Sequence, residues 1–245
     1  MTDSQEIQRE KFPEIQSRLK VVPNIITIDG PDGTGKTTLS GFFYHFLAKK
    51  FGKEYVVLLE ATNVGGSLSQ ERLRRLHKTV KLSWQRENQL YSAGVNRAYG
   101  DIVTPAIAKG QLVVIDRSEV DLLRYALQLK DETVIADRIR YLECGILTRG
   151  YLAKNRVYVT SSREDILANL NDRPNRSPYD PQTLEDIDQQ LSSQERAEAC
   201  IQEVYIEPLN IIRINNQRQS NNPKEYLRSI AKYIAENIDL PSDFQ

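Results

Sequence analysis

The chain has 245 residues, with 33 basic and 33 acidic side chains and a formal net charge of zero. This length suits one α/β domain, and the balanced charge excludes the strongly basic proteins that bind duplex nucleic acid or an anionic membrane surface. No apolar run approaches the roughly 20 residues that span a bilayer, and the polar N-terminus is not a secretory signal. Because there are only two cysteines, Cys144 and Cys200, we expect free thiols and a cytoplasmic location.

Strands and helices are predicted to alternate along the chain. Residues 1–22 are interpreted as a polar N-terminal extension and residues 23–240 as a single domain. Short β-branched or apolar runs predict five buried strands, at residues 24–29, 55–59, 112–115, 157–159 and 211–214. Helical spacing is found near residues 36–51, 90–108, 120–153, 163–171, 183–208 and 223–238. The alternation predicts an α/β fold with a five-stranded parallel sheet and helices on both faces.

The turn after the first strand carries the strongest motif. Residues 30–37 read Gly-Pro-Asp-Gly-Thr-Gly-Lys-Thr and match G-x-x-x-x-G-K-[ST] between a strand and a helix. The backbone amides of such a loop and the helix N-terminus form an anion site. We therefore expect ATP on this loop, with Lys36 near its β- and γ-phosphates and the Thr37 hydroxyl on Mg²⁺. The predicted nucleotide-binding residues are Gly30, Asp32, Gly33, Thr34, Gly35, Lys36, Thr37 and Thr38.

Two acids, one inside this loop and one after the third strand, are further candidates. Asp32 would repel a bound phosphate unless it serves magnesium or a ligand hydroxyl; the alternative is a turn-forming aspartate that faces solvent. Asp116 directly follows the third strand, and ligands of open parallel sheets gather at the carboxyl ends of strands. We predict that Asp116 holds a magnesium-bound water and that Arg117 binds a phosphate or ribose oxygen. The alternative is a structural salt bridge between Asp116 and Arg117.

Three segments together resemble the thymidylate kinase family of P-loop nucleotide kinases. Residues 28–38, IDGPDGTGKTT, are similar to the family's phosphate loop, and residues 96–117 to its helix-to-strand segment that ends in Asp-Arg. Residues 172–180, DRPNRSPYD, are similar to the arginine-bearing lid of nucleotide kinases. The resemblance implies a P-loop NTPase fold and transfer of phosphate from ATP to a deoxynucleoside monophosphate, with dTMP as the expected acceptor. It also suggests a homodimer.

The same resemblance implies roles for single residues. Asp32 acts near the sugar hydroxyl, while Arg97 and Arg117 bind the acceptor phosphate. Arg173 and Arg176 belong to a lid at about residues 171–182, and arginines that arrive on closure stabilise the charge of the moving phosphoryl group; their alternative is solvated charges on a loop. The implied catalytic residues are Lys36, Asp32, Arg117, Arg173 and Arg176, and the implied substrate-binding residues are Glu60, Arg97, Asp116, Arg117 and Tyr125.

Departures from the family pattern leave the acceptor open. Leu59, Ala93 and Ser118 replace an arginine, a stacking aromatic and another aromatic of the family, and Ala126 replaces a glutamine. One alternative is a deoxynucleoside kinase in which Glu60 deprotonates a 5′-hydroxyl. A second is a non-enzymatic protein that uses the loop as a nucleotide-gated switch.

Overall fold

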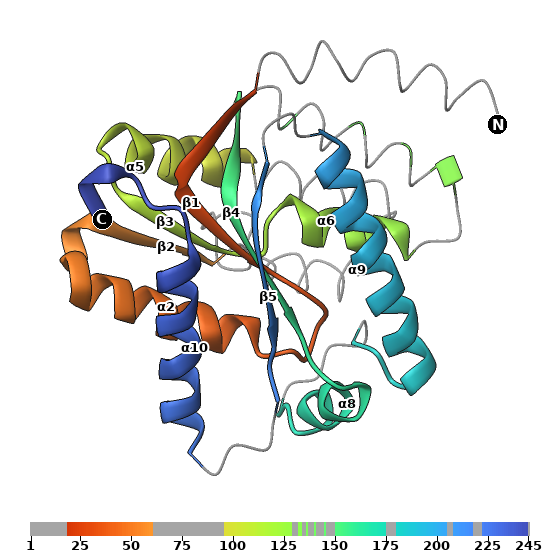
Figure 1. Ribbon diagram of the computed structural model, residues 1–245. Coiled ribbons are helices and arrows are strands. Elements are labelled where there is room, and N and C mark those ends of the chain that lie inside the picture. The colour runs from red at the N-terminus through yellow and green to blue at the C-terminus, as the bar shows by residue number, and fades with distance from the viewer. Residues whose placement is uncertain are drawn as a thin grey trace.

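Five parallel strands form one sheet in the order β2-β3-β1-β4-β5 (Figure 1). This computed structural model describes residues 19–60, 96–128, 150–174, 180–204, 208–217 and 222–244, with a few isolated residues between 132 and 145. The strands are β1 (Lys20–Asp29), β2 (Val56–Glu60), β3 (Leu112–Asp116), β4 (Tyr151–Thr160) and β5 (Asn210–Asn215). Every neighbouring pair is parallel, which confirms the predicted sheet.

Two strands are longer than the sequence pattern predicts. Residues 20–22 of β1 pair with residues 151–153 of β4, and the register then shifts between Val22 and Ile26. This irregularity contains Pro23, which has no N–H to donate to the hydrogen bonds between the strands. The helix expected as far as residue 153 is therefore wrong at its end, and the sheet begins inside the segment interpreted as an extension. Residues 1–18 lie outside the described residues, so the extension and the single-domain assignment stay predictions.

Helices cover both faces of the sheet. On one face lie α2 (Lys36–Phe51) and α10 (Pro223–Asn237), and on the other η2 (Tyr99–Val103), α5 (Thr104–Ala108), α6 (Glu119–Leu127) and α9 (Leu184–Val204). α2 lies beside α10 and α6 beside α9 (Figure 1). The other helices of the described residues are η1 (Lys53–Tyr55), α8 (Arg163–Asn171) and η3 (Ser242–Phe244). This two-sided cover confirms the predicted fold class.

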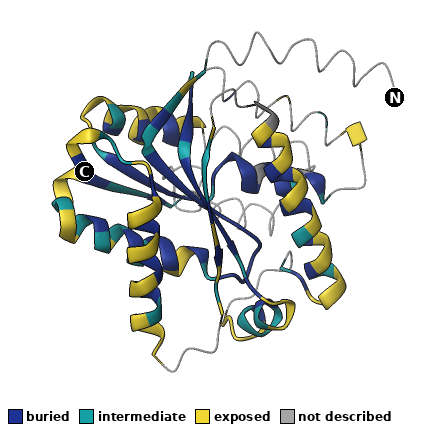
Figure 2. Ribbon diagram, viewed as in Figure 1, coloured by how far each residue is buried: buried dark blue, intermediate teal, exposed yellow. Residues whose placement is uncertain are grey.

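The core follows the two faces of each strand. Ile26 and Ile28 of β1 pack toward α2 and α10, whereas Ile25 packs toward the segment that contains Tyr99. Figure 2 shows the strands largely buried and the outward faces of α9 and α10 exposed. Among the helices of the described residues, none combines the length and apolar character of a membrane span.

The parallel register brings the carboxyl ends of the strands to one edge. Glu60 at the end of β2 pairs with Asp116 at the end of β3, and Asp116 pairs with Ile28 of β1. β1 ends at Asp29, directly before the glycine-rich turn. The candidate residues of three strands therefore meet at this edge, as expected for ligand sites of open parallel sheets.

Candidate functional site

The phosphate loop has a backbone shape that depends on glycine. Gly33 and Gly35 have φ angles of 89° and 82°, in the left-handed region that other residues rarely adopt. A Cβ atom on Gly33 would lie 2.9 Å from the carbonyl oxygen of Ile166 in α8. Asn169 of the same helix donates to the carbonyl oxygen of Gly33 at 2.9 Å. α8 therefore packs directly on the loop and holds its turn.

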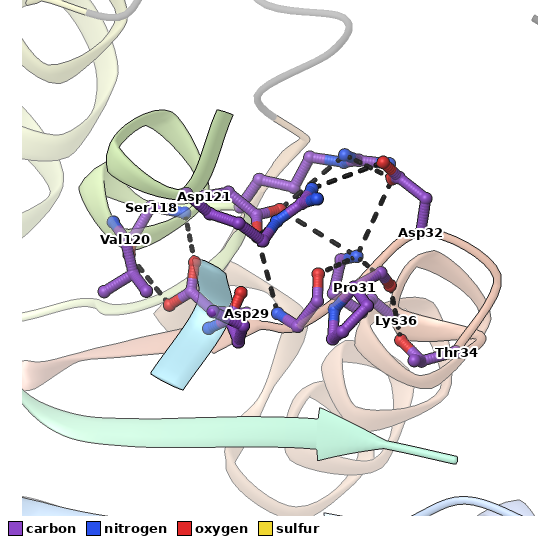
Figure 3. Close-up of polar contacts among 12 residues, drawn as sticks. Asp29, Pro31, Asp32, Thr34, Lys36, Ser118, Val120 and Asp121 are labelled. Atoms are coloured by element: carbon purple, nitrogen blue, oxygen red, sulfur yellow. Dashed lines mark hydrogen bonds and ion pairs between the residues drawn. The ribbon is translucent and has the colours of Figure 1, made fainter. Parts of the chain in front are cut away.

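Lys36 lies at the first position of α2 and is buried against this loop. Its ammonium group donates to the carbonyl oxygen of Gly30 and, at 2.7 Å, to that of Pro31 (Figure 3). The carboxylates of Asp121 and Asp32 lie 3.9 and 4.0 Å from Nζ. Burial lowers the pKa of Lys36 from 10.5 to about 8, although Asp121 and Asp32 favour the charged form.

Asp32 is buried, so the alternative interpretation of a solvent-facing turn residue is wrong. Its Oδ1 accepts from Arg117 NH1 at 2.9 Å, and its Oδ2 accepts from Arg124 NH2 at 3.2 Å and from the Tyr125 hydroxyl at 2.8 Å. Burial alone would raise the pKa of Asp32, but Arg117, Arg124 and Lys36 outweigh it and hold that pKa well below its usual 3.8. Asp32 is therefore a fixed anion among cations.

Arg117 has an unusual backbone. Among the described residues other than glycine, Arg117 alone has a positive φ angle, of 76°. Its N–H donates to the carbonyl oxygen of Ile28 at 3.1 Å. Strained conformations of this kind cluster at functional sites. The turn places Arg117 NH1 within 2.9 Å of both Asp32 Oδ1 and the Tyr125 hydroxyl. The Asp-Arg turn after β3 is thus joined to the phosphate loop.

Asp116 fits a divalent cation. Its side chain is fully buried, and neither carboxylate oxygen makes a hydrogen bond to the described residues. Burial raises its pKa, while Arg117, the nearby Thr37 hydroxyl and Lys36 favour its ionised form. Two unpaired carboxylate oxygens beside a threonine hydroxyl provide the hard oxygen ligands that Mg²⁺ prefers.

A second group of buried polar residues lies beside the loop, and sequence reasoning missed it. Ser118 donates its N–H and hydroxyl to Asp29, at 2.7 and 2.8 Å (Figure 3). Burial, reinforced by the negative charge of Asp121, raises the pKa of Asp29 to about 7. The sequence interpretation did not use Asp29, although the acid ends the first strand directly before the loop.

Arg156 and Glu119 form a buried ion pair, with Arg156 NH2 2.5 Å from Glu119 Oε1. The Tyr99 hydroxyl donates to Glu119 Oε2 at 3.3 Å. Glu119 and Asp121 had no predicted role in the site, and both are almost completely buried. The signal that could have indicated more is their position, since they follow directly on the Asp-Arg turn.

The remaining predicted residues are more scattered. Glu60 pairs in register with Asp116. Arg97 is exposed and its Nε lies 3.1 Å from Asp101 Oδ2, and Arg173 NH1 lies 3.7 Å from Asp180 Oδ2. Within the described residues, these two arginines thus form local ion pairs and do not contact the loop. Arg176 lies outside the described residues, as do the other residues of the predicted lid between 175 and 179.

Comparisons with known proteins agree with the motifs. A family model described as thymidylate kinase matches residues 28–141. A thymidylate kinase of Thiobacillus denitrificans is 34% identical over 118 residues, 48% of this chain and 55% of that protein. One from Finegoldia magna is 30% identical over 103 residues, 41% of this chain and 49% of that protein. The chain thus spans about half the length of the curated relatives it matches.

A solved structure extends the likeness in fold. The crystal structure of thymidylate kinase from Ehrlichia chaffeensis has a TM-score of 0.56 with this chain and covers 86% of it and 97% of the solved chain. The sequence identity is 15%, so this likeness concerns the fold alone. Together with the family match, it confirms the resemblance inferred from the motifs and the P-loop fold.

Proposed function

We propose that this chain, a divergent relative of the thymidylate kinases over residues 28–141, phosphorylates a deoxynucleoside monophosphate, with dTMP as the expected acceptor. The terminal phosphoryl group of ATP passes to a phosphate oxygen of dTMP and leaves ADP, so the products are ADP and dTDP. The observation that carries the proposal is the contact between Asp32 of the phosphate loop and Arg117 of the Asp-Arg turn, at 2.9 Å. The contact supports the proposal, because a donor site and an acceptor site that share it would hold their two phosphates close together.

The donor side consists of the loop, Lys36 and the first turn of α2. A triphosphate at this helix N-terminus replaces the carbonyl contacts of Lys36 and, being negative, favours its charged form. Thr37 and Asp116 are the residues that would hold Mg²⁺. When bound, this ion neutralises charge on the phosphate oxygens.

The acceptor side begins at Arg117. Its guanidinium can bind a phosphate through two parallel hydrogen bonds, and Arg97 is assigned to the same phosphate. Glu60 and Tyr125 are assigned to the rest of the nucleotide, because Glu60 pairs in register with Asp116 and the Tyr125 hydroxyl lies 2.9 Å from Arg117 NH1. Because a monophosphate is already an anion, the transfer needs no general base. Arg173 and Arg176 are assigned to the lid, where they stabilise the charge that spreads over the moving group.

A deoxynucleoside kinase is the second candidate, because Glu60 lies in register beside Asp116, which carries two unpaired carboxylate oxygens. Such a carboxylate pair at the acceptor side is able to take a proton from a 5′-hydroxyl. The two functions differ in the acceptor they require: a phosphate anion or a neutral hydroxyl.

The test is ATP-dependent ADP release by the purified chain with Mg²⁺ and one acceptor at a time. We expect turnover with dTMP and little with thymidine, and the Lys36→Ala variant serves as the inactive control. Turnover of thymidine without turnover of dTMP would favour the deoxynucleoside kinase. Tight ATP binding with no turnover of any nucleoside or nucleotide would favour the nucleotide-gated switch.

A further inference from the structure

Helix α6 contacts the phosphate loop through side chains that lie on one of its faces. Asp121 Oδ1 accepts from the Gly30 N–H at 3.5 Å. Arg124 NH2 and the Tyr125 hydroxyl both donate to Asp32 Oδ2, at 3.2 and 2.8 Å. Positions 121, 124 and 125 are spaced by three and four residues, so they share a helix face. The helix thus holds the loop at its first and third positions.

Arg124 is built into this contact. Its side chain has no exposed surface, its Nε lies 3.4 Å from Asp121 Oδ1, and its guanidinium lies 4.1 Å from the centre of the Tyr125 ring. A buried arginine with carboxylates at Nε and NH2 is held in one orientation. Asp121 therefore orients Arg124, and Arg124 in turn faces Asp32.

The arrangement affects how easily the Arg117 guanidinium can leave Asp32 and bind an acceptor phosphate. Asp32 has two oxygens: Oδ1 faces Arg117, and Oδ2 faces Arg124 and Tyr125. An acceptor phosphate must draw Arg117 away from Asp32 and from Asp121, whose carboxylate lies 3.6 Å from Arg117 NH1, and must approach the negative charge of Asp32. A second cation fixed on Oδ2 reduces both penalties, because it compensates Asp32 whether or not Arg117 stays.

We propose that Arg124, oriented by Asp121, is a positioning residue that compensates the charge of Asp32, so that Arg117 is available to an anionic acceptor phosphate. This inference rests on the proposed function for its acceptor. Neither residue needs to touch the reacting atoms. The effect of removing Arg124 is expected on acceptor binding rather than on ATP binding, since Lys36 and the loop amides remain.

The kinetic test compares Arg124→Met with Arg124→Lys, which retains the charge. For Arg124→Met we expect the KM for dTMP to rise about tenfold or more and the KM for ATP to change less than about threefold. Arg124→Lys recovers part of the loss. Arg228→Met, at an exposed position of α10 on the other face of the sheet, is the matched control and leaves both constants unchanged.

A double-mutant cycle separates charge compensation from packing. In an Asp32→Asn background, Arg124→Met is expected to change the KM for dTMP by less than about threefold, because the charge to be compensated is gone. An equal effect of Arg124→Met in both backgrounds would overturn the inference. So would an equal rise of both KM values.

Urea unfolding tests the contact between Arg124 and Asp32 without any turnover. The four proteins of the cycle are the wild type, Arg124→Met, Asp32→Asn and the double variant. The midpoint is expected to fall in Arg124→Met and to recover when Asp32→Asn is added, and additive changes would overturn the contact between the two charges. A wild-type chain that turns over no monophosphate would refute the proposed function and the acceptor role with it. The unfolding cycle would still decide whether Arg124 compensates Asp32, so the two failures are distinguishable.

Discussion

Replacing Lys36 with methionine is expected to abolish turnover without destabilising the fold. The ammonium group is buried, and burial lowers the pKa of Lys36 from 10.5 to about 8. At about 1.36 kcal/mol per pKa unit, keeping it charged at neutral pH costs the folded state about 3 kcal/mol. Methionine has a similar length and no charge. In the variant the carbonyls of Gly30 and Pro31 lose their donor, which costs about 1 kcal/mol each. The free energy of unfolding is therefore expected to rise by about 1 kcal/mol in Lys36→Met at pH 7.

The pH dependence gives the sharper measurement. Between pH 8 and 10.5 the unfolded chain keeps a proton on Lys36 that the folded chain has released, so folding of the wild type becomes more favourable as pH rises through this window. Below pH 8 Lys36 is protonated in both the folded and the unfolded chain, so the folded state bears the full cost of the buried charge. Relative to Lys36→Met, the wild type should therefore gain about 3 kcal/mol from pH 8 to 10.5. Groups common to both proteins cancel in this difference.

Urea unfolding at pH 7, 8, 9 and 10, together with ADP release at pH 7, is the assay. Turnover should fall about a hundredfold or more, as for the loss of a group that stabilises transition-state charge. Lys232→Met is the control, since Lys232 is exposed on α10, 3.7 Å from Glu236, and should show no such pH difference. A Lys36→Met variant less stable than the wild type by more than about 1 kcal/mol at pH 7, with a pH-independent difference, would refute the reasoning.

Other variants test the loop, the cation site and the sheet. Gly33→Ala should lower the free energy of unfolding by about 2 kcal/mol or more, because of its φ of 89° and the Ile166 carbonyl 2.9 Å from the new Cβ. Gly41→Ala should leave the free energy of unfolding unchanged, because nothing lies within 4 Å of the new Cβ. Equal losses of stability for the two variants in urea unfolding would contradict this. Asp116→Asn should change stability by less than about 1 kcal/mol, since a neutral isostere replaces an unpaired buried carboxylate. It should raise the Mg²⁺ concentration for half-maximal turnover about tenfold, and an unchanged requirement would remove Asp116 from the metal site. Asn155→Ala should cost about 2–4 kcal/mol, because the buried amide bonds to Pro23, Asp239 and Asn210. A loss below about 1 kcal/mol in urea unfolding would count against that network.

Much of the fold was predictable from local pattern. Apolar runs and the helices between them are properties of short segments, so the parallel sheet followed from their alternation. The strand ends were less predictable: β1 and β4 extend toward their N-termini because they pair with each other across a bulge at Pro23. No local pattern in either segment indicates the other.

The candidate site divides in the same way. The phosphate loop and Asp116 could be located because each is a contiguous motif at the end of a predicted strand. Arg124 and Asp121 could not, since Arg124 meets Asp32 across 92 positions of the chain. Arg156 likewise meets Glu119 across 37 positions. Arg97 and Arg173 remain predictions, because their contacts in the described structure are local.

By itself, the sequence determined where a polyanion can bind, because the turn of Gly33 and Gly35 and the start of α2 depend on neighbouring residues. Only the tertiary structure decided which charges surround that turn. The state of a buried carboxylate depends on the cations that other elements bring within a few ångströms, and on the water that packing removes. Asp32 is a fixed anion, and Asp29 has a pKa of about 7, although both are aspartates of the same short segment.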